Sequence, residues 1–233
     1  MPVRTEREGP VHVVTIDRPE RRNAVDGPMA RALGDAFAAF ESDPEAKVAV
    51  LTGAGGTFCA GNDLKAMAAG DFPVPTETAP PMNVTRTALG KPVIAAVEGY
   101  CFGGGFELAL WCDLRVASAT AEFGALNLRR GLPCMDSGTV RLPRLVGHAR
   151  ALDILLTARR VPAAEAERIG LVTRLTAEGE ALPAALELAR EIAETPQEAL
   201  RAARRSVIEQ WSLSDRDAAA NETRHAEAVL PAF

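Results

Sequence analysis

The chain of 233 residues lacks a basic excess and any long apolar run. Its net charge is −5, with acidic and basic residues interspersed, so no broad basic field is available to hold nucleic acid or an anionic membrane surface. No apolar run is long enough to span a bilayer. We therefore expect neither nucleic acid nor a membrane as a partner, and any anionic ligand must be held locally.

Paired cysteines are also missing. Cys59, Cys101, Cys112 and Cys134 form no Cys-x-x-Cys pair and have no histidine at zinc-ligand spacing. This excludes a recognisable metal motif and favours reduced core thiols. The first eight residues are polar and charged and lack the apolar stretch of a secretory signal. These features favour a soluble protein of a reducing cytoplasm.

Alternating strand and helix patterns predict an α/β fold. Strand-like runs cover residues 11–16, 48–52, 91–97, 114–117 and 171–175, and helical patterns cover residues 29–40, 106–112, 140–146, 149–157 and 162–169. The remainder reads as helices over 184–194, 196–210 and 214–230. Residues 67–81 carry prolines and glycines without periodicity, which predicts a mobile loop or lid. The apolar residues at 226, 229 and 230 can pack on the core or on another subunit, and we favour the second.

Two glycine-rich segments each follow a strand-like run. The first, residues 53–56, lacks the Gly-Lys-Ser/Thr of a phosphate loop and the dinucleotide fingerprint, so a tight connection is the simpler interpretation. The second, Gly103 to Gly105, opens a helix. Unpaired N–H groups at a helix start favour negative charge, such as an enolate oxygen. Close packing of helix against strand is the alternative explanation.

A single carboxylate, Glu107, lies in the first turn of that strongly apolar helix. Burial raises the pKa of a carboxyl toward neutrality, as a proton-transfer group requires, whereas the positive helix end acts in the opposite direction. The alternative is a structural ion pair with an arginine such as Arg115. Burial alone does not decide between the two roles.

Several motifs together resemble the enoyl-CoA hydratase/isomerase (crotonase) superfamily. They cover nearly the whole chain and are FCAGNDL at 58–64, KPVIAAVEGY at 91–100, GGGFELA at 103–109, CD at 112–113, FG at 123–124, TVRLPRLVG at 139–147 and AERIGLV at 166–172. The resemblance implies a spiral of repeated ββα units over residues 1–178. Residues 179–233 are then a C-terminal helical region for oligomerisation and cover of the site. It also implies homotrimers or pairs of trimers.

The resemblance further implies an acyl-CoA thioester as substrate, with coenzyme A entering as part of the substrate and no permanently bound cofactor. Backbone N–H groups of Asn62 and Gly104 would form the oxyanion hole, and Glu107 would be the first of two catalytic glutamates. The expected CoA-binding positions, including basic side chains toward the phosphates, are Arg21, Arg22, Ala24, Ala60, Asp63, Leu64 and Lys65.

The chain departs from the family pattern at the second glutamate, where it has Asn127. An amide can orient a water molecule but cannot exchange its proton. Asp136 is the candidate substitute, by similarity to an aspartate of the dienoyl-CoA isomerases with a difference of one residue in spacing. A helix N-cap for residues 137–146 is the plainer role for Asp136.

The resulting prediction is an enoyl-CoA hydratase in which two main-chain amides polarise the thioester and Glu107 activates water. An enoyl-CoA double-bond isomerase is the alternative, because a single carboxylate that removes and returns a proton suffices for it. A non-catalytic acyl-CoA-binding protein is the third possibility.

Overall fold

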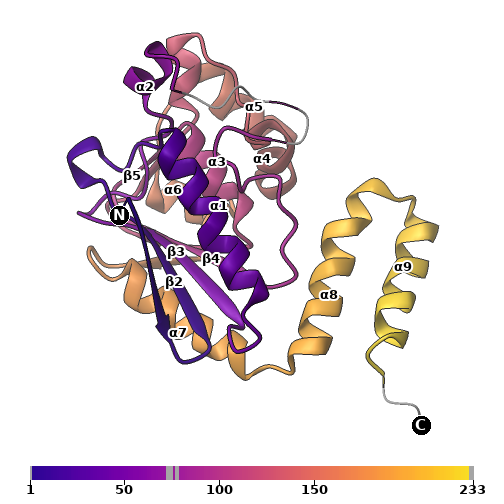
Figure 1. Ribbon diagram of the computed structural model, residues 1–233. Coiled ribbons are helices and arrows are strands. Elements are labelled where there is room, and N and C mark those ends of the chain that lie inside the picture. Colours follow the sequence, from indigo (N-terminus) through magenta and orange to yellow (C-terminus); the bar gives the residue numbers. More distant parts are fainter. Residues whose placement is uncertain (1, 72–75, 77–78, 231–233) are drawn as a thin grey trace.

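The computed structural model describes residues 2–71, 76 and 79–230, and a six-stranded sheet is its framework (Figure 1). The strand order is β1-β2-β3-β4-β6-β9, with β1 antiparallel to β2 and all other neighbours parallel. The strands are β1 (Val3–Glu8), β2 (Val11–Ile16), β3 (Val48–Gly53), β4 (Val93–Val97), β6 (Leu114–Ser118) and β9 (Arg174–Thr176). A smaller sheet contains β5 (Tyr100–Phe102), β7 (Glu122–Gly124) and β8 (Val161–Pro162).

Side-chain alternation along the central strands explains why both faces of the large sheet are covered. In β3, Ala49 and Leu51 point into the main core with α1 (Gly27–Ser42) and α3 (Gly104–Trp111). Val48 and Val50 point into a second core with α7 (Ala181–Glu194). A strand that is buried on both faces has the continuous apolar sequence seen here.

The chain repeats one ββα unit, as predicted. β4 lies in the large sheet, β5 in the small sheet, and α3 follows; β6, β7 and the 3₁₀ helix η2 (Leu126–Arg130) repeat this order. The segment after β3 joins the small sheet through a bridge between Cys59 and Cys101 before α2 (Leu64–Ala68) begins. Successive units therefore bring their strand-to-helix connections together.

The remaining elements complete the body and the C-terminal region. They are η1 (Pro19–Arg21), α4 (Gly138–Val146), α5 (His148–Thr157), α6 (Ala163–Arg168), α8 (Gln197–Glu209), η3 (Gln210–Ser212) and α9 (Asp215–Glu227). Whereas α7 packs on the large sheet, α8 and α9 pack on each other and project from the body (Figure 1). In the described ranges, no helix is both long and apolar enough to cross a bilayer.

The structure contains short elements that the sequence did not predict, namely α2, β5, β7 and β8, and the strand predicted at 171–175 begins only at Arg174. Two further differences have a clear physical reason. The edge strand β1 was not predicted, because only Val3 is buried and its other five residues are exposed, with four of them charged; charged side chains are usual on an edge strand. The predicted loop at 67–81 begins with the last turn of α2, and Met82 and Val84 beyond it are buried. Residues 72–75 and 77–78 of that loop lie outside the described residues.

Candidate active site

A cavity of about 580 Å³ lies where the start of α3 meets the segment before α2. It is lined by all but one of the predicted site residues. Those that line it are Arg21, Arg22, Ala24, Ala60, Asn62, Asp63, Leu64, Lys65, Gly104, Glu107 and Asn127. The exception is Asp136, which is fully buried behind the cavity wall. No described residue from 179 onward lines the cavity.

Asn62 and Gly104 lie side by side because the two segments that carry them are paired. The Cys59 N–H donates to the Tyr100 carbonyl at 2.9 Å, and the Phe102 N–H donates to the Cys59 carbonyl at 3.0 Å. Each candidate oxyanion residue follows its paired cysteine by three positions. Gly61 allows the close approach, since a Cβ there would lie 2.9 Å from the Phe102 carbonyl oxygen and 3.2 Å from the Gly104 nitrogen.

Both candidate oxyanion N–H groups are free to bind a ligand. The backbone on either side of Asn62 is bound to Val25. The Val25 N–H donates to the Gly61 carbonyl and the Asp63 N–H donates to the Val25 carbonyl, both at 2.8 Å. The Asn62 N–H therefore points away from Val25. Gly104 is the first residue of α3, so its N–H has no acceptor within the helix. Neither group donates to any residue in the described part of the chain.

Glu107 projects from α3 and is only 2% exposed. Its Oε1 accepts hydrogen bonds from the N–H groups of Gly138 at 2.7 Å and Asp136 at 2.9 Å, and its Oε2 accepts one from Met135 at 3.3 Å. Burial, aided by the neighbouring carboxyl of Asp136, raises the pKa of Glu107 to about 7. The carboxyl is thus able to take up and release a proton near neutral pH.

The alternative ion pair between Glu107 and Arg115 is wrong. The guanidinium of Arg115 donates instead to four backbone carbonyls, those of Ala109, Cys112, Asp113 and Leu171. Arg115 therefore ties the end of α3 to β6 and to the segment before β9. The hydrogen bonds that Glu107 accepts from described residues come from backbone N–H groups and not from a cationic side chain.

Asn127 lines the cavity, and one hydrogen bond fixes the orientation of its amide. Its Nδ2 donates to the Leu132 carbonyl at 2.9 Å, and a carbonyl can accept only from the nitrogen of the amide. This bond fixes the amide so that Oδ1 is the other atom. Oδ1 is buried and has no donor among the described residues.

Asp136 does not cap a helix, contrary to the plainer of its two predicted roles. Its Oδ1 accepts hydrogen bonds from the Met82 N–H at 2.9 Å and from the Thr85 hydroxyl at 2.6 Å. The first amide of α4, that of Gly138, is bound by Glu107, and Ser137 makes no side-chain cap. Burial raises the pKa of Asp136, and this carboxyl lies beside Glu107 without reaching the cavity.

The cavity wall is more cationic than the sequence predicted. Besides Arg21, Arg22 and Lys65, it includes Arg130 and Arg160. The guanidiniums of Arg22 and Arg160 lie 5.6 and 5.7 Å from the ring centre of Tyr100. No sequence pattern indicated Arg130 and Arg160, because isolated basic residues are usually only solvated.

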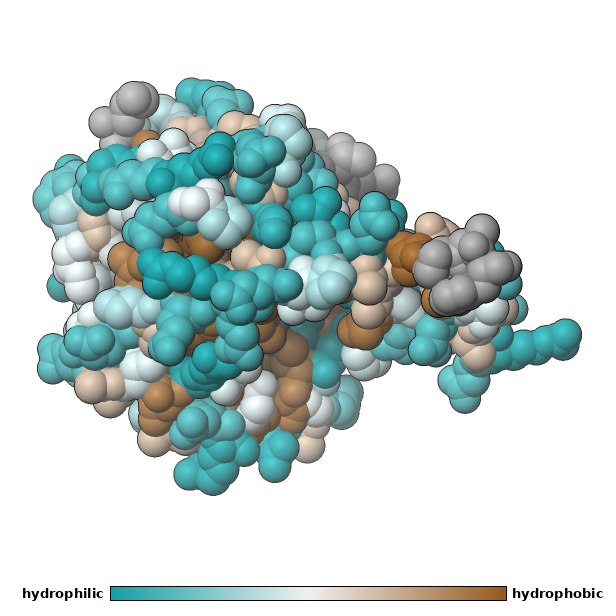
Figure 2. Space-filling view, turned by 90° about the horizontal axis from the view of Figure 1, so that it is seen from below, coloured by the Kyte–Doolittle hydropathy of each residue, from teal (hydrophilic) through white to brown (hydrophobic). Residues whose placement is uncertain are grey.

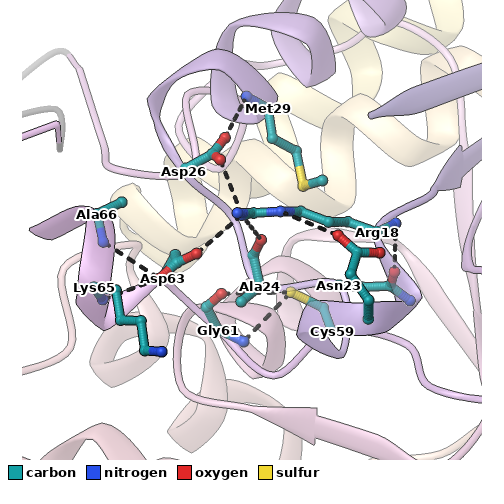
Figure 3. Close-up of polar contacts among 11 residues, drawn as sticks. Arg18, Asn23, Ala24, Asp26, Met29, Cys59, Gly61, Asp63, Lys65 and Ala66 are labelled. Atoms are coloured by element: carbon teal, nitrogen blue, oxygen red, sulfur yellow. Dashed lines mark hydrogen bonds and ion pairs between the residues drawn. The ribbon is translucent and has the colours of Figure 1, made fainter. Parts of the chain in front are cut away.

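Asp63 lines the cavity but turns its carboxylate inward. Oδ1 accepts from the N–H groups of Lys65 and Ala66 at the start of α2, and Oδ2 pairs with Arg18 at 3.0 Å (Figure 3). Arg18 was not predicted as part of the site, because it lies outside the cavity and its role depends on contacts between distant segments.

A model of the enoyl-CoA hydratase/isomerase family matches residues 6–230 of the chain. The chain belongs to this enzyme family. A carnitinyl-CoA dehydratase of Salmonella arizonae is 42% identical over 197 residues, covering 83% of this chain and 75% of the relative. The family resemblance seen in the sequence is therefore confirmed.

Solved structures of the enoyl-CoA hydratase/isomerase family share the fold. An enoyl-CoA hydratase of Mycobacterium tuberculosis superposes with a TM-score of 0.92 at 39% identity, covering 96% of this chain and 88% of that one. One from Mycobacterium marinum gives a TM-score of 0.93 at 37% identity, covering 98% and 90%. The predicted α/β fold of this family is thus confirmed over nearly the full length.

Proposed function

We propose that this family member adds water across the double bond of a trans-2-enoyl-CoA and catalyses the reverse dehydration. The observation that carries the proposal is a buried carboxyl, Glu107, that lines one cavity together with two residues whose main-chain N–H groups are free, Asn62 and Gly104. Asn127 lines the same cavity, and its Oδ1 is buried without a hydrogen-bond partner among the described residues. The relatives named enoyl-CoA hydratase and carnitinyl-CoA dehydratase support the same class of reaction.

In this mechanism the thioester carbonyl oxygen lies between the N–H groups of Asn62 and Gly104. When a nucleophile adds to Cβ, negative charge moves onto that oxygen. Donors that are already fixed in place stabilise this charge, and one such donor lowers the activation free energy by on the order of 3 kcal/mol. The paired segments around Cys59 and Cys101 keep both donors fixed.

Glu107 and Asn127 would together orient the attacking water. The water donates one hydrogen bond to the Glu107 carboxylate and the other to Asn127 Oδ1, which leaves an oxygen lone pair for Cβ. Glu107 takes the proton as the new C–O bond forms, and then delivers a proton to Cα. Because an amide does not titrate, Glu107 carries both proton transfers alone.

The cationic wall supports binding of the CoA portion. Arg21, Arg22 and Lys65 line the cavity, and a guanidinium can bind a phosphate through two parallel hydrogen bonds. Ala24, Ala60 and Leu64 line the same cavity. Coenzyme A thus enters as part of the substrate.

A double-bond isomerase is the second candidate. Among the described residues that line the cavity, Glu107 and Asp63 are the carboxylates, and Asp63 is already paired with Arg18. A single base can move a proton between Cα and Cγ without any water. The unpartnered Oδ1 of Asn127 favours hydration over isomerisation, because isomerisation needs no acceptor there.

The two candidates are separated by the absorbance of the conjugated thioester. We expect a short trans-2-enoyl-CoA to lose its conjugation on incubation with the protein, and a 3-enoyl-CoA to remain unchanged. Gain of conjugation from the 3-enoyl-CoA, with no loss from the 2-enoyl-CoA, would establish the isomerase instead. Binding of both without turnover would support the non-catalytic alternative.

The proposed role of Glu107 predicts the pH dependence of hydration. Water activation needs the carboxylate, and burial raises the pKa of Glu107 to about 7. We therefore expect kcat/KM for hydration to rise about tenfold per pH unit up to about pH 7 and to level off above it. Rates with trans-2-enoyl-CoA from pH 5 to 9 test this. A profile that stays level down to pH 5 would contradict the assignment.

We also propose that the projecting helices α8 and α9 mediate assembly into a homotrimer or a dimer of trimers. Val207, Ile208 and Trp211 are 64%, 48% and 51% exposed, and Figure 2 shows hydrophobic residues on the projecting part as well as on the body. Exposed apolar groups that lie close together are typical of interfaces.

Light scattering after gel filtration tests the assembly. We expect the double change Val207→Asp and Ile208→Asp to give a folded monomer. Leu156→Asp on α5 is the control, since Leu156 is even more exposed, and we expect it to leave the oligomer intact. A monomeric wild type would overturn the proposal.

A further inference from the structure

We propose that Arg18 is a positioning residue that sets the direction of the Asn62 N–H, without itself touching the cavity. This inference rests on the proposed function, in which that N–H binds the thioester oxygen. It assigns to the loop between β2 and α1 a part in catalysis that no motif of the sequence indicates.

One nitrogen of Arg18 holds three acceptors from two separate segments (Figure 3). Its Nη1 lies 2.9 Å from Asp26 Oδ2, 3.0 Å from Asp63 Oδ2 and 3.2 Å from the Ala24 carbonyl. The guanidinium thereby joins residues 24–26 to the end of the segment that contains Asn62.

Each of the two carboxylates is also a helix cap. Asp26 Oδ1 accepts from the Met29 N–H at 3.0 Å at the start of α1, and Asp63 Oδ1 accepts from the Lys65 N–H at 2.9 Å at the start of α2. Their second oxygens are the ones that bind Arg18. Arg18 therefore fixes two helix starts relative to each other.

Arg18 with its acceptors on Ala24, Asp26 and Asp63, here called the clamp, lies on both sides of the strand pairing that orients Asn62. Val25 pairs with Asn62 through two hydrogen bonds. The Val25 N–H donates to the Gly61 carbonyl, and the Val25 carbonyl accepts from the Asp63 N–H. Arg18 binds Ala24 and Asp26, the residues on either side of Val25, and it binds Asp63, the residue after Asn62. A shift of Asp63 would rotate the Asn62 amide, whereas the Gly104 amide is held separately by α3.

The positive charge of Arg18 is needed because it lies between two carboxylates, those of Asp26 and Asp63. Asp26 and Asp63 approach the same nitrogen within about 3 Å, and their side chains are largely buried, so solvent screens them poorly. Without Arg18 the two carboxylates repel each other. The resulting separation moves Asp63, and with it the donor on Asn62.

The test uses the whole chain of 233 residues with Arg18→Met and follows two properties. With the enoyl-CoA substrate, we expect kcat to fall by about 10²-fold, the loss typical of a displacement near 1 Å, while the Kd for free coenzyme A changes less than threefold. Binding of an aromatic enoyl-CoA should shift its absorbance to longer wavelength in the wild type, because donors to the carbonyl polarise the conjugated system. We expect this shift to shrink in Arg18→Met.

Two aspartate variants keep the inference testable even if Arg18→Met does not fold. Asn caps helices as well as Asp, so Asp63→Asn and Asp26→Asn both retain their caps and lose one ion pair. We expect Asp63→Asn to reduce the absorbance shift and Asp26→Asn to leave most of it. A full shift and wild-type kcat in Arg18→Met, or equal effects of the two aspartate variants, would overturn the role of Arg18. A wild type without any shift would instead show that the proposed oxyanion hole is wrong.

Discussion

Glu107→Gln is expected to lower kcat for hydration by about 10²- to 10⁴-fold, the range that a general acid-base group contributes. The variant should stay folded, because the glutamine carbonyl can replace Oε1, which accepts the two shortest hydrogen bonds, from Gly138 and Asp136. Only the longer bond from Met135 to Oε2 is lost. Steady-state rates with trans-2-enoyl-CoA measure the effect.

Stability provides a check on this variant that does not depend on activity. The pKa of Glu107 is raised from 4.5 to about 7 in the folded protein, so between these values the folded state binds more protons than the unfolded state. The stability that neutral Glu107 provides is therefore present at low pH and is lost as the pH rises through about 7. Glutamine stays neutral, so this part of the pH dependence should be missing from Glu107→Gln.

Thermal unfolding at pH 5 and pH 8 distinguishes the two proteins. From pH 5 to pH 8, we expect the wild type to lose more stability than Glu107→Gln, by up to about 3 kcal/mol. Equal turnover in the two proteins would remove Glu107 from the mechanism. Equal pH dependence of unfolding would show that the carboxyl is not held neutral by burial.

The sequence located the parts of the site that local patterns encode. Three successive glycines before an apolar helix indicated free N–H groups at the helix start, and the carboxylate at Glu107 stood out in an apolar helix. The choice of Gly104 and Asn62 as the donors came from the family resemblance. The strand patterns predicted the central strands of the large sheet, because these strands are buried on both faces, and missed its edge strand β1. These features depend on residues that are close together in the chain.

Features that depend on distant contacts were not predicted. Asp136 is a good N-cap residue by its local context, yet its carboxylate binds Met82 and Thr85, which lie 54 and 51 positions earlier. Glu107 binds the α4 amide from 31 positions away. Arg18 likewise links residues that lie far apart in the sequence. Local sequence preferences do not show which of several side chains binds the N–H groups at a helix start, because the competing side chain can come from a distant segment.

The contact between Glu107 and α4 leads to the second large expected effect, that of Gly138→Ala. A Cβ on Gly138 would lie 2.8 Å from both Cγ and Oε1 of Glu107 and 3.1 Å from its Cδ. The backbone of Gly138 lies outside the left-handed region, so alanine is allowed there and favours the helix. The added methyl group must therefore displace the Glu107 carboxylate.

We expect Gly138→Ala to lower kcat by about 10²-fold through this displacement, with little change in KM, because Gly138 does not line the cavity. Thr139→Ala is the matched control, since Thr139 is the next residue of α4 and is exposed; it should keep wild-type rates. Circular dichroism should show both variants folded. Wild-type kcat in Gly138→Ala would mean that the catalytic carboxyl is not held against α4, and the water-binding geometry proposed for Glu107 and Asn127 would fail with it.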